Sequence, residues 1–204
     1  MSGPEALRFA ANLYRLPAPG GYFLVDAGLP WEAKRLLRQL PGPPKLLFLT
    51  HHHLDHSGGA RALWERFGIP VLAHPREWPY LTGERPRPPL PVPLLGGWLA
   101  NLAPPLPKEA LRPVAEGDEV LGWRVVALPG HTLGQVGLLR EGVLIAGDAL
   151  RGRGLPPRWI NEDHEAARGT LRKILELGVE RVYLGHGGPL GREEVEALAR
   201  RLGV

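Results

Sequence analysis

Residues 50–56 read Thr50-His51-His52-His53-Leu54-Asp55-His56 and place three candidate metal ligands of one kind beside a carboxylate. An apolar run of strand length, residues 45–49, precedes them. Residues 57–64 read as a loop that enters a helix, with Ser57 as its candidate N-cap. The ligands are therefore expected where a strand ends and a helix begins, which is where open sites collect in α/β folds. Neutral imidazole suits zinc and related transition metals, and a carboxylate oxygen extends the site to a second cation.

Three further polar residues occupy the same position after an apolar run. His131 follows residues 124–128, Asp148 follows residues 143–146, and His186 follows residues 181–184. Each has a glycine directly before it, and glycine lets the backbone turn sharply and leaves room for a substrate. One loop is too short to complete the coordination of a metal site, so these strand-end residues are predicted to supply the remaining ligands.

Taken in chain order, this set of residues resembles the ligand set of the metallo-β-lactamase superfamily. The resemblance extends over nearly the whole chain and includes residues 12–14 and 24–28 ahead of the metal loop. It implies an α/β fold, a four-layer αββα sandwich with two metals at one edge, formed by a single domain over residues 1–204. It also implies the ligand roles: His51, His53 and His131 for one zinc, Asp55, His56 and His186 for the second, and Asp148 as the bridge between them.

The chemistry of the residues agrees with these implied roles. A ligand that bridges two cations should be an anion with two oxygens, which Asp148 provides and a histidine does not. A two-metal site holds a bridging water as hydroxide near neutral pH and polarises a substrate oxygen. We therefore expect two Zn²⁺ per chain, with iron or manganese as alternative ions. Asp55 is predicted to be the catalytic residue, because one oxygen would ligate a metal while the other orients the attacking hydroxide.

Differences from particular members narrow the predicted reaction. Lactamases of the best-known type use a cysteine in the second site and another type lacks the bridging aspartate, whereas this chain has no cysteine and has Asp148. Glyoxalase II has the same seven ligands but adds a C-terminal helical region for glutathione, and only residues 187–204 follow the last ligand here. The predicted function is hydrolysis of a small ester, thioester or lactone by a metal-bound hydroxide at a glyoxalase II-like site.

Other functions stay open. The first alternative is another enzyme of the same superfamily, either an iron-dependent oxidoreductase resembling the persulfide dioxygenases or a phosphodiesterase or nuclease. A complete second metal site argues against the former, and the extra domains or arms of the nucleases would not fit in 204 residues. The other is a binding protein that keeps the fold without catalysis, which loss of ligands would mark, and none is lost.

The composition of the chain limits the kinds of partner that we expect. The chain is 44% hydrophobic, lacks cysteine and carries a net charge of +4, but no block of like charges appears. A solvated basic surface is therefore expected rather than a nucleic-acid partner. Zinc sites built from His and Asp without thiolates are more often catalytic than structural. No signal peptide or membrane-spanning run is apparent, so a cytoplasmic location, a small-molecule substrate and no membrane partner are expected.

Hydrophobic periodicity and turn residues predict the remaining elements. The prediction is a hairpin over 11–28 with its turn at 17–21, a helix over 31–40, a helix to about 67, a strand at 69–73, mostly strands over 114–148, and helices over 163–177 and 191–202.

Residues 79–113 form a proline-rich insertion that the periodicity does not explain. Ten prolines fall within it, including Pro91 and Pro93, around an apolar face of Leu95, Trp98, Leu99 and Leu102. This face is predicted to act as a lid over the site or as an interface in a homo-oligomer, with packing onto its own sandwich as the alternative.

Two residues near the metal loop are interpreted as supporting ones. His52 alternates with the ligands, so its side chain should point away from the metals. Asp26 is a ligand by residue type, but its position in the resemblance indicates a structural role beside the loop.

Overall fold

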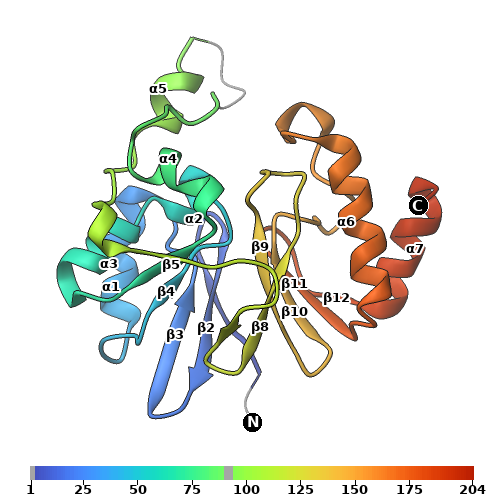
Figure 1. Cartoon of the computed structure of the whole chain (residues 1–204), viewed down its shortest axis with the longest axis horizontal. Coiled ribbons are helices and arrows are strands. Elements are labelled where there is room, and N and C mark those ends of the chain that lie inside the picture. The colour runs from blue at the N-terminus through green and yellow to red at the C-terminus, as the bar shows by residue number, and fades with distance from the viewer. Residues whose placement is uncertain (1–2, 90–93) are drawn as a thin grey trace. The chain divides into compact units, whose positions relative to one another are not determined.

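The computed structural model describes residues 3–89 and 94–204 and contains two compact units, Met1–Val114 (unit 1) and Ala115–Val204 (unit 2). Each unit is a six-stranded sheet with helices (Figure 1). The mixed α/β class expected from the sequence is confirmed. That residues 1–204 form one domain stays a prediction.

The sheet of unit 1 follows chain order from β1 to β6. Its strands are β1 (Glu5–Arg8), β2 (Asn12–Ala18), β3 (Gly21–Val25), β4 (Leu47–Phe48), β5 (Val71–Ala73) and β6 (Leu111–Pro113). The first three strands are antiparallel, and β3 to β6 are parallel neighbours. The carboxyl ends of β3, β4 and β5 therefore lie at one edge, and the loop of residues 50–56 begins at that edge.

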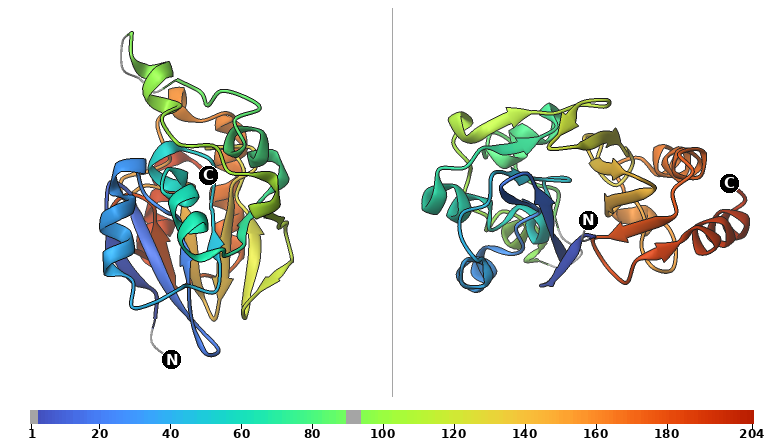
Figure 2. Two further views of the ribbon diagram at one scale, coloured as in Figure 1. Left: turned by 90° about the vertical axis from the view of Figure 1, so that its left-hand side faces the viewer. Right: turned by 90° about the horizontal axis from the view of Figure 1, so that it is seen from below.

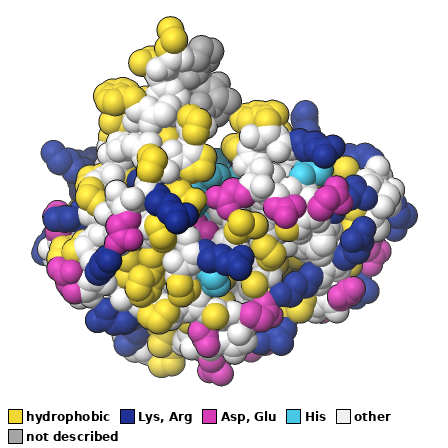
Figure 3. Space-filling view, turned by 45° about the horizontal axis from the view of Figure 1, so that its top comes forward, with side chains coloured by type: hydrophobic (Ala, Val, Ile, Leu, Met, Phe, Trp, Pro, Cys, Tyr) yellow, Lys and Arg dark blue, Asp and Glu magenta, His cyan; other side chains and the backbone are white. Residues whose placement is uncertain are grey.

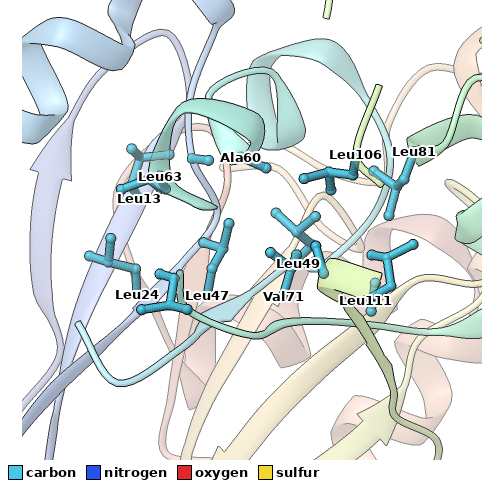
Figure 4. Packing of buried hydrophobic residues seen from close by; sticks show 14 of the residues in the cluster. Leu13, Leu24, Leu47, Leu49, Ala60, Leu63, Val71, Leu81, Leu106 and Leu111 are labelled. Atoms are coloured by element: carbon cyan, nitrogen blue, oxygen red, sulfur yellow. The ribbon is translucent and has the colours of Figure 1, made fainter. Parts of the chain in front are cut away.

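The helices of unit 1 lie between its strands in the chain. They are α1 (Ala33–Gln39), α2 (Leu54–Ser57), α3 (Ala60–Phe67), α4 (Trp78–Leu81) and α5 (Gly96–Ala100), with 3-10 turns η1 (Pro30–Glu32), η2 (Pro75–Glu77) and η3 (Lys108–Ala110). Leu36 of α1 and Leu63 of α3 are fully buried in one apolar cluster with Leu24 and Leu47 of the strands. Figure 4 shows Leu24, Leu47 and Leu63 packed together, so the core forms between the helices and one face of the sheet.

Unit 2 contains a second sheet in the order β12-β11-β10-β9-β8-β7. Its elements are β7 (Glu119–Val120), β8 (Trp123–Ala127), β9 (Val136–Arg140), β10 (Val143–Gly147), η4 (Arg158–Ile160), α6 (His164–Glu176), β11 (Arg181–Leu184), β12 (Leu190–Gly191) and α7 (Arg192–Leu202). The pair β10 and β11 is parallel and is connected through α6. Helices α6 and α7 lie side by side (Figure 1), and Ile174 and Leu198 pack into a core with Val182.

Most predicted elements are confirmed, with shorter bounds at several ends. The hairpin is β2 and β3, but its turn is confined to residues 19–20 because Pro17 and Ala18 still pair with β3. The strand expected at 45–49 is labelled only at Leu47–Phe48, although the Leu49 amide still donates to the Leu72 carbonyl at 2.8 Å.

The prediction that Ser57 is an N-cap is wrong. Residues 54–57 wind into the separate turn of helix α2, because the amides of His56 and Ser57 both donate to the His53 carbonyl at 3.0 and 2.9 Å. Helix α3 begins after Gly59 instead. A Cβ at Gly59 would lie 2.3 Å from the Ala27 carbonyl oxygen, so only glycine allows this close approach between the loop and the end of β3.

The proline-rich segment carries the exposed apolar surface expected of it. Helix α5 stands away from the rest of unit 1 in Figures 1 and 2, and hydrophobic side chains gather over it in Figure 3. Leu95 is 53% exposed and Trp98 is 65% exposed. Pro91 and Pro93 lie outside the described residues. Among the described residues, no helix combines the length and apolar character that a membrane span requires.

Candidate metal centre

Four predicted ligands lie together on the loop and short helix that follow β4. The ring centroids of His51 and His53 are 4.7 Å apart, and those of His51 and His56 are 4.2 Å apart. Asp55 lies beside them, with Oδ2 at 3.8 Å from His56 Nε2. The side chain of Asp55 is 30% exposed whereas His51 and His56 are fully buried. Unit 1 thus gathers His51, His53, Asp55 and His56 at the edge where its parallel strands end.

Asp26 holds this loop from the end of β3, as the sequence indicated. Its Oδ1 accepts from the Thr50 amide at 2.8 Å, and its Oδ2 accepts from the Thr50 hydroxyl at 2.9 Å and lies 2.7 Å from His56 Nδ1. Asp26 has φ +63°, a left-handed conformation that aspartate tolerates better than most residues. Since the carboxylate engages Nδ1, the other ring nitrogen of His56, Nε2, is the candidate ligand atom.

His52 is held by two side chains from outside the metal loop, and its ring centroid also lies 4.9 Å from that of His53. Its ring stacks on Tyr80 at 4.1 Å between centroids, and its Nδ1 lies against Glu77 Oε2. Glu77 is 1% exposed, so this acid and His52 form a buried pair beside the loop. That His52 supports the site without binding a metal stays a prediction.

The other three predicted ligands lie together in unit 2. His131 follows β8, Asp148 follows β10, and His186 follows β11. Asp148 Oδ2 lies 3.6 Å from His131 Nε2 and 3.5 Å from His186 Nε2. Arg151 Nη2 donates to the same oxygen at 3.0 Å. One carboxylate oxygen therefore sits at nearly equal distances from two imidazole nitrogens, in a location that suits a bridging ligand.

The turn before His131 is fixed by helix α6. Gly130 has φ +136°, and a Cβ there would lie 2.3 Å from the amide nitrogen of Ala167. The Gly130 carbonyl accepts from the Asp163 amide at 3.0 Å, and the Thr170 hydroxyl donates to the Pro129 carbonyl. Because a side chain at residue 130 would collide with helix backbone, glycine is required for this close packing.

Several residues that contact a candidate ligand or the loop around it were not found from the sequence. Asn161 Oδ1 lies 3.3 Å from His131 Nδ1, and the buried Glu77 and Arg87 contact the backbone of His52. Their residue types and local sequence give no signal, because each contact joins positions 25 or more residues apart.

Comparison with known proteins decides the family. A sequence model of the metallo-β-lactamase superfamily matches residues 8–186. The chain belongs to the metallo-β-lactamase superfamily. A probable metallo-hydrolase of Bacillus subtilis, YflN, is 31% identical over 94% of this chain and 88% of its own length. A hydroxyacylglutathione hydrolase of Idiomarina loihiensis is 27% identical over 80% of this chain, which spans 55% of that relative.

Solved structures of the superfamily match as well. The structure of TTHA1623 in a di-iron-bound form has a TM-score of 0.77 and 30% identity, over 97% of this chain and 98% of that one. The fold class predicted from the resemblance, an α/β fold of the metallo-β-lactamase type, is thereby confirmed. The protein is a metal-binding hydrolase of this superfamily, which removes a catalytically inactive binding protein from the alternatives.

The residues present fit a metal. Each of the seven predicted ligands is a His or Asp side chain that can offer one ligand atom to an ion. The buried imidazoles of His51, His56 and His131 each have a polar partner at Nδ1, which is the arrangement that orients a metal-binding histidine. The chain has no thiolate to compete, so nitrogen and carboxylate oxygen are the donors available.

Proposed function

We propose that this metallo-hydrolase uses two zinc ions to cleave a small ester, thioester or lactone. The observation that carries the proposal is the location of Asp148 between the imidazoles of His131 and His186. A carboxylate is the natural bridge between two cations, and a metal pair supports hydrolysis through a water nucleophile.

We further propose that the seven candidate residues take the ligand roles that membership of the family implies. Unit 1 supplies His51, His53, Asp55 and His56, and unit 2 supplies His131, Asp148 and His186. Neither set alone has enough donors for two four-coordinate ions. The family model spans residues of both units, which supports the proposal. In this arrangement His51, His53 and His131 would hold one ion, Asp55, His56 and His186 the other, and Asp148 both.

The bound ions would supply a hydroxide nucleophile near neutral pH and a Lewis acid for the substrate carbonyl. The protein's own residues would do the rest. Asp55, the more exposed of the two candidate acids, would orient the nucleophile and transfer a proton toward the leaving group. Asp26 would keep the His56 ring in its ligand orientation through the contact at Nδ1.

The substrate class is supported by the relatives. One is named hydroxyacylglutathione hydrolase, and YflN is named only as a probable metallo-hydrolase. A small-molecule substrate is therefore proposed. The ion is proposed as zinc on the donor set, and iron is the second candidate because the structurally similar TTHA1623 is described in a di-iron-bound form.

The test combines metal analysis with a substrate panel. Purified protein is analysed for zinc, iron and manganese per chain and assayed with ester, thioester, lactone and phosphodiester substrates. We expect two ions per chain and activity on one of the first three classes. Asp148→Asn should lose the second ion and the activity, whereas Asp118→Asn, at an exposed turn of the same unit, should retain both. One ion at full occupancy, or turnover of the phosphodiester alone, would overturn the proposal.

A further inference from the structure

The peptide groups of His52 are bound by two charged side chains from outside the metal loop. The His52 amide donates to Glu77 Oε2 at 2.8 Å. The His52 carbonyl accepts from Arg87 Nε at 2.9 Å and from the Ser57 hydroxyl at 2.8 Å. His52 belongs to neither a strand nor a helix, so no backbone ladder fixes the orientation of its peptide groups. The three side chains therefore help to set that orientation.

Arg87 is an unusual group for this purpose. It is 6% exposed, and its Nη2 donates to the Ser57 hydroxyl at 3.3 Å, so both of its bonds to the loop end on neutral oxygens. Among residues 3–89 and 94–204, no carboxylate forms an ion pair with it. Burial lowers the pKa of Arg87 to about 10, which still leaves it charged at neutral pH. Burying a cation without an acid is costly, so its contacts with the loop must compensate.

We propose that Arg87 is a positioning residue that holds His51 and His53 in the orientation needed to bind a metal. His51 and His53 flank His52 in the chain, so the orientation of the His52 peptide groups affects where both of these side chains point. His52 is held against Glu77 and Tyr80, and Arg87 fixes the carbonyl that leads into His53. The inference rests on the proposed function, because it takes His51 and His53 as ligands.

The same arginine connects the metal loop to helix α5. The Arg87 amide donates to Asn101 Oδ1 at 2.7 Å, and Asn101 Nδ2 donates to the Gly97 carbonyl of α5 at 2.8 Å. The guanidinium of Arg87 then reaches His52 and Ser57. Arg87 thus connects α5, through Asn101, to His52 and Ser57, all within unit 1.

The experiment compares Arg87→Met and Arg87→Lys with a matched control, Arg85→Met, an exposed arginine two residues earlier. Zinc affinity is measured by competition with a chelator, and the visible spectrum of the Co²⁺-loaded protein reports coordination geometry. Arg87→Met should bind zinc about 10–100-fold more weakly and alter the cobalt spectrum, as loss of a residue that orients ligands does. Arg85→Met should match the wild type in both.

Arg87→Lys separates the effect of the guanidinium geometry from that of the positive charge. It also provides a second variant in case Arg87→Met does not fold. Lysine keeps the charge and the aliphatic stem but lacks the planar fork that contacts two acceptors. We expect a folded protein with intermediate affinity. Wild-type affinity and spectrum in folded Arg87→Lys, or in folded Arg87→Met, would overturn this inference while leaving the two-metal proposal intact. Failure of the wild type to bind zinc or iron would instead sink the proposed function.

Discussion

Asp55 and Asp148 are the two acids of the ligand set, and they differ most in exposure. The side chain of Asp55 is 30% exposed, while that of Asp148 is 2% exposed and ion-paired with Arg151. An exposed carboxylate can reach a substrate, whereas a buried one next to two imidazoles can only act inside the centre. This contrast supports giving Asp55 the proton-transfer role and Asp148 the bridging role in the proposed mechanism.

The first prediction concerns Asp55→Asn. The amide keeps one oxygen for a metal but is a far weaker proton acceptor, so turnover should fall by about 10²–10⁴-fold while the fold is kept. Initial rates on the preferred substrate, with melting temperature and zinc content in parallel, test this. Asp118→Asn serves as the control. A variant that turns over at the wild-type rate would show that Asp55 moves no proton.

At the residue level, the sequence indicates the positions of candidate ligands better than the residues that contact the loop around them. The location of His131, Asp148 and His186 at strand ends was predictable because each follows an apolar run and a glycine. Arg87 and Glu77 were not, because their contacts with His52 span 35 and 25 residues and depend on how the chain returns to the loop. Local sequence indicates where a candidate ligand lies relative to a strand. Which distant side chain contacts the loop around it depends on tertiary packing.

Among the short elements, η2 has an unusual cap. His74 Nδ1 accepts a hydrogen bond from the Arg76 amide at 3.2 Å, so the ring caps the turn only when that nitrogen is unprotonated. Burial lowers the pKa of His74 below its ordinary value of about 6.5, opposed by Glu77 and reinforced by Arg76. Below that pH the unfolded chain takes up a proton that the folded one resists, so the free energy of unfolding decreases as pH falls.

The second prediction follows from this cap. Asparagine caps helical turns without titrating. The melting temperature of His74→Asn should therefore decline less than that of the wild type between about pH 7 and pH 5, and the two should agree most closely above pH 7. Thermal unfolding at fixed zinc and ionic strength measures it. Parallel pH profiles for the two proteins would show that His74 titrates equally in both states.

The third prediction concerns α5. Its exposed Trp98 should contact either the substrate or a second copy of the chain, because removing a large apolar side chain from water is favourable. Trp98→Ala should raise the Michaelis constant or shift the oligomeric state, with metal content unchanged. Trp31→Ala in η1, which is 62% exposed, is the matched control. A loss of thermal stability alone would make α5 ordinary packing.

Elements were predictable wherever one periodicity dominated. The hairpin and helices α6 and α7 agree with the sequence prediction within a few residues because their apolar positions repeat regularly. The turn of α2 was missed, since it contains the ligands themselves and offers no apolar repeat of its own. The path of the proline-rich segment was also unpredictable, because prolines exclude regular structure without specifying an alternative.

At the scale of the whole molecule, the metals are expected to stabilise both units, because each supplies ligands in the proposed centre. The fourth prediction is that removal of the metal by a chelator lowers the melting temperature by about 5–10 °C, the effect of a ligand present at a hundred times its dissociation constant. Hydrogen exchange should accelerate around His53 in unit 1 and around His131 in unit 2. Acceleration in only one unit would mean that the other contributes no ligand.

The division of the ligands between Met1–Val114 and Ala115–Val204 also has a consequence for how the protein is made. Translation proceeds from the N-terminus, and compact units tend to fold as they emerge from the ribosome. The loop that bears His51 and Asp55 is therefore complete before Asp148 and His186 have been synthesised. If the proposed ligand roles hold, an ion bound by the first half alone would lack the ligands of His131, Asp148 and His186 until the second half has been synthesised.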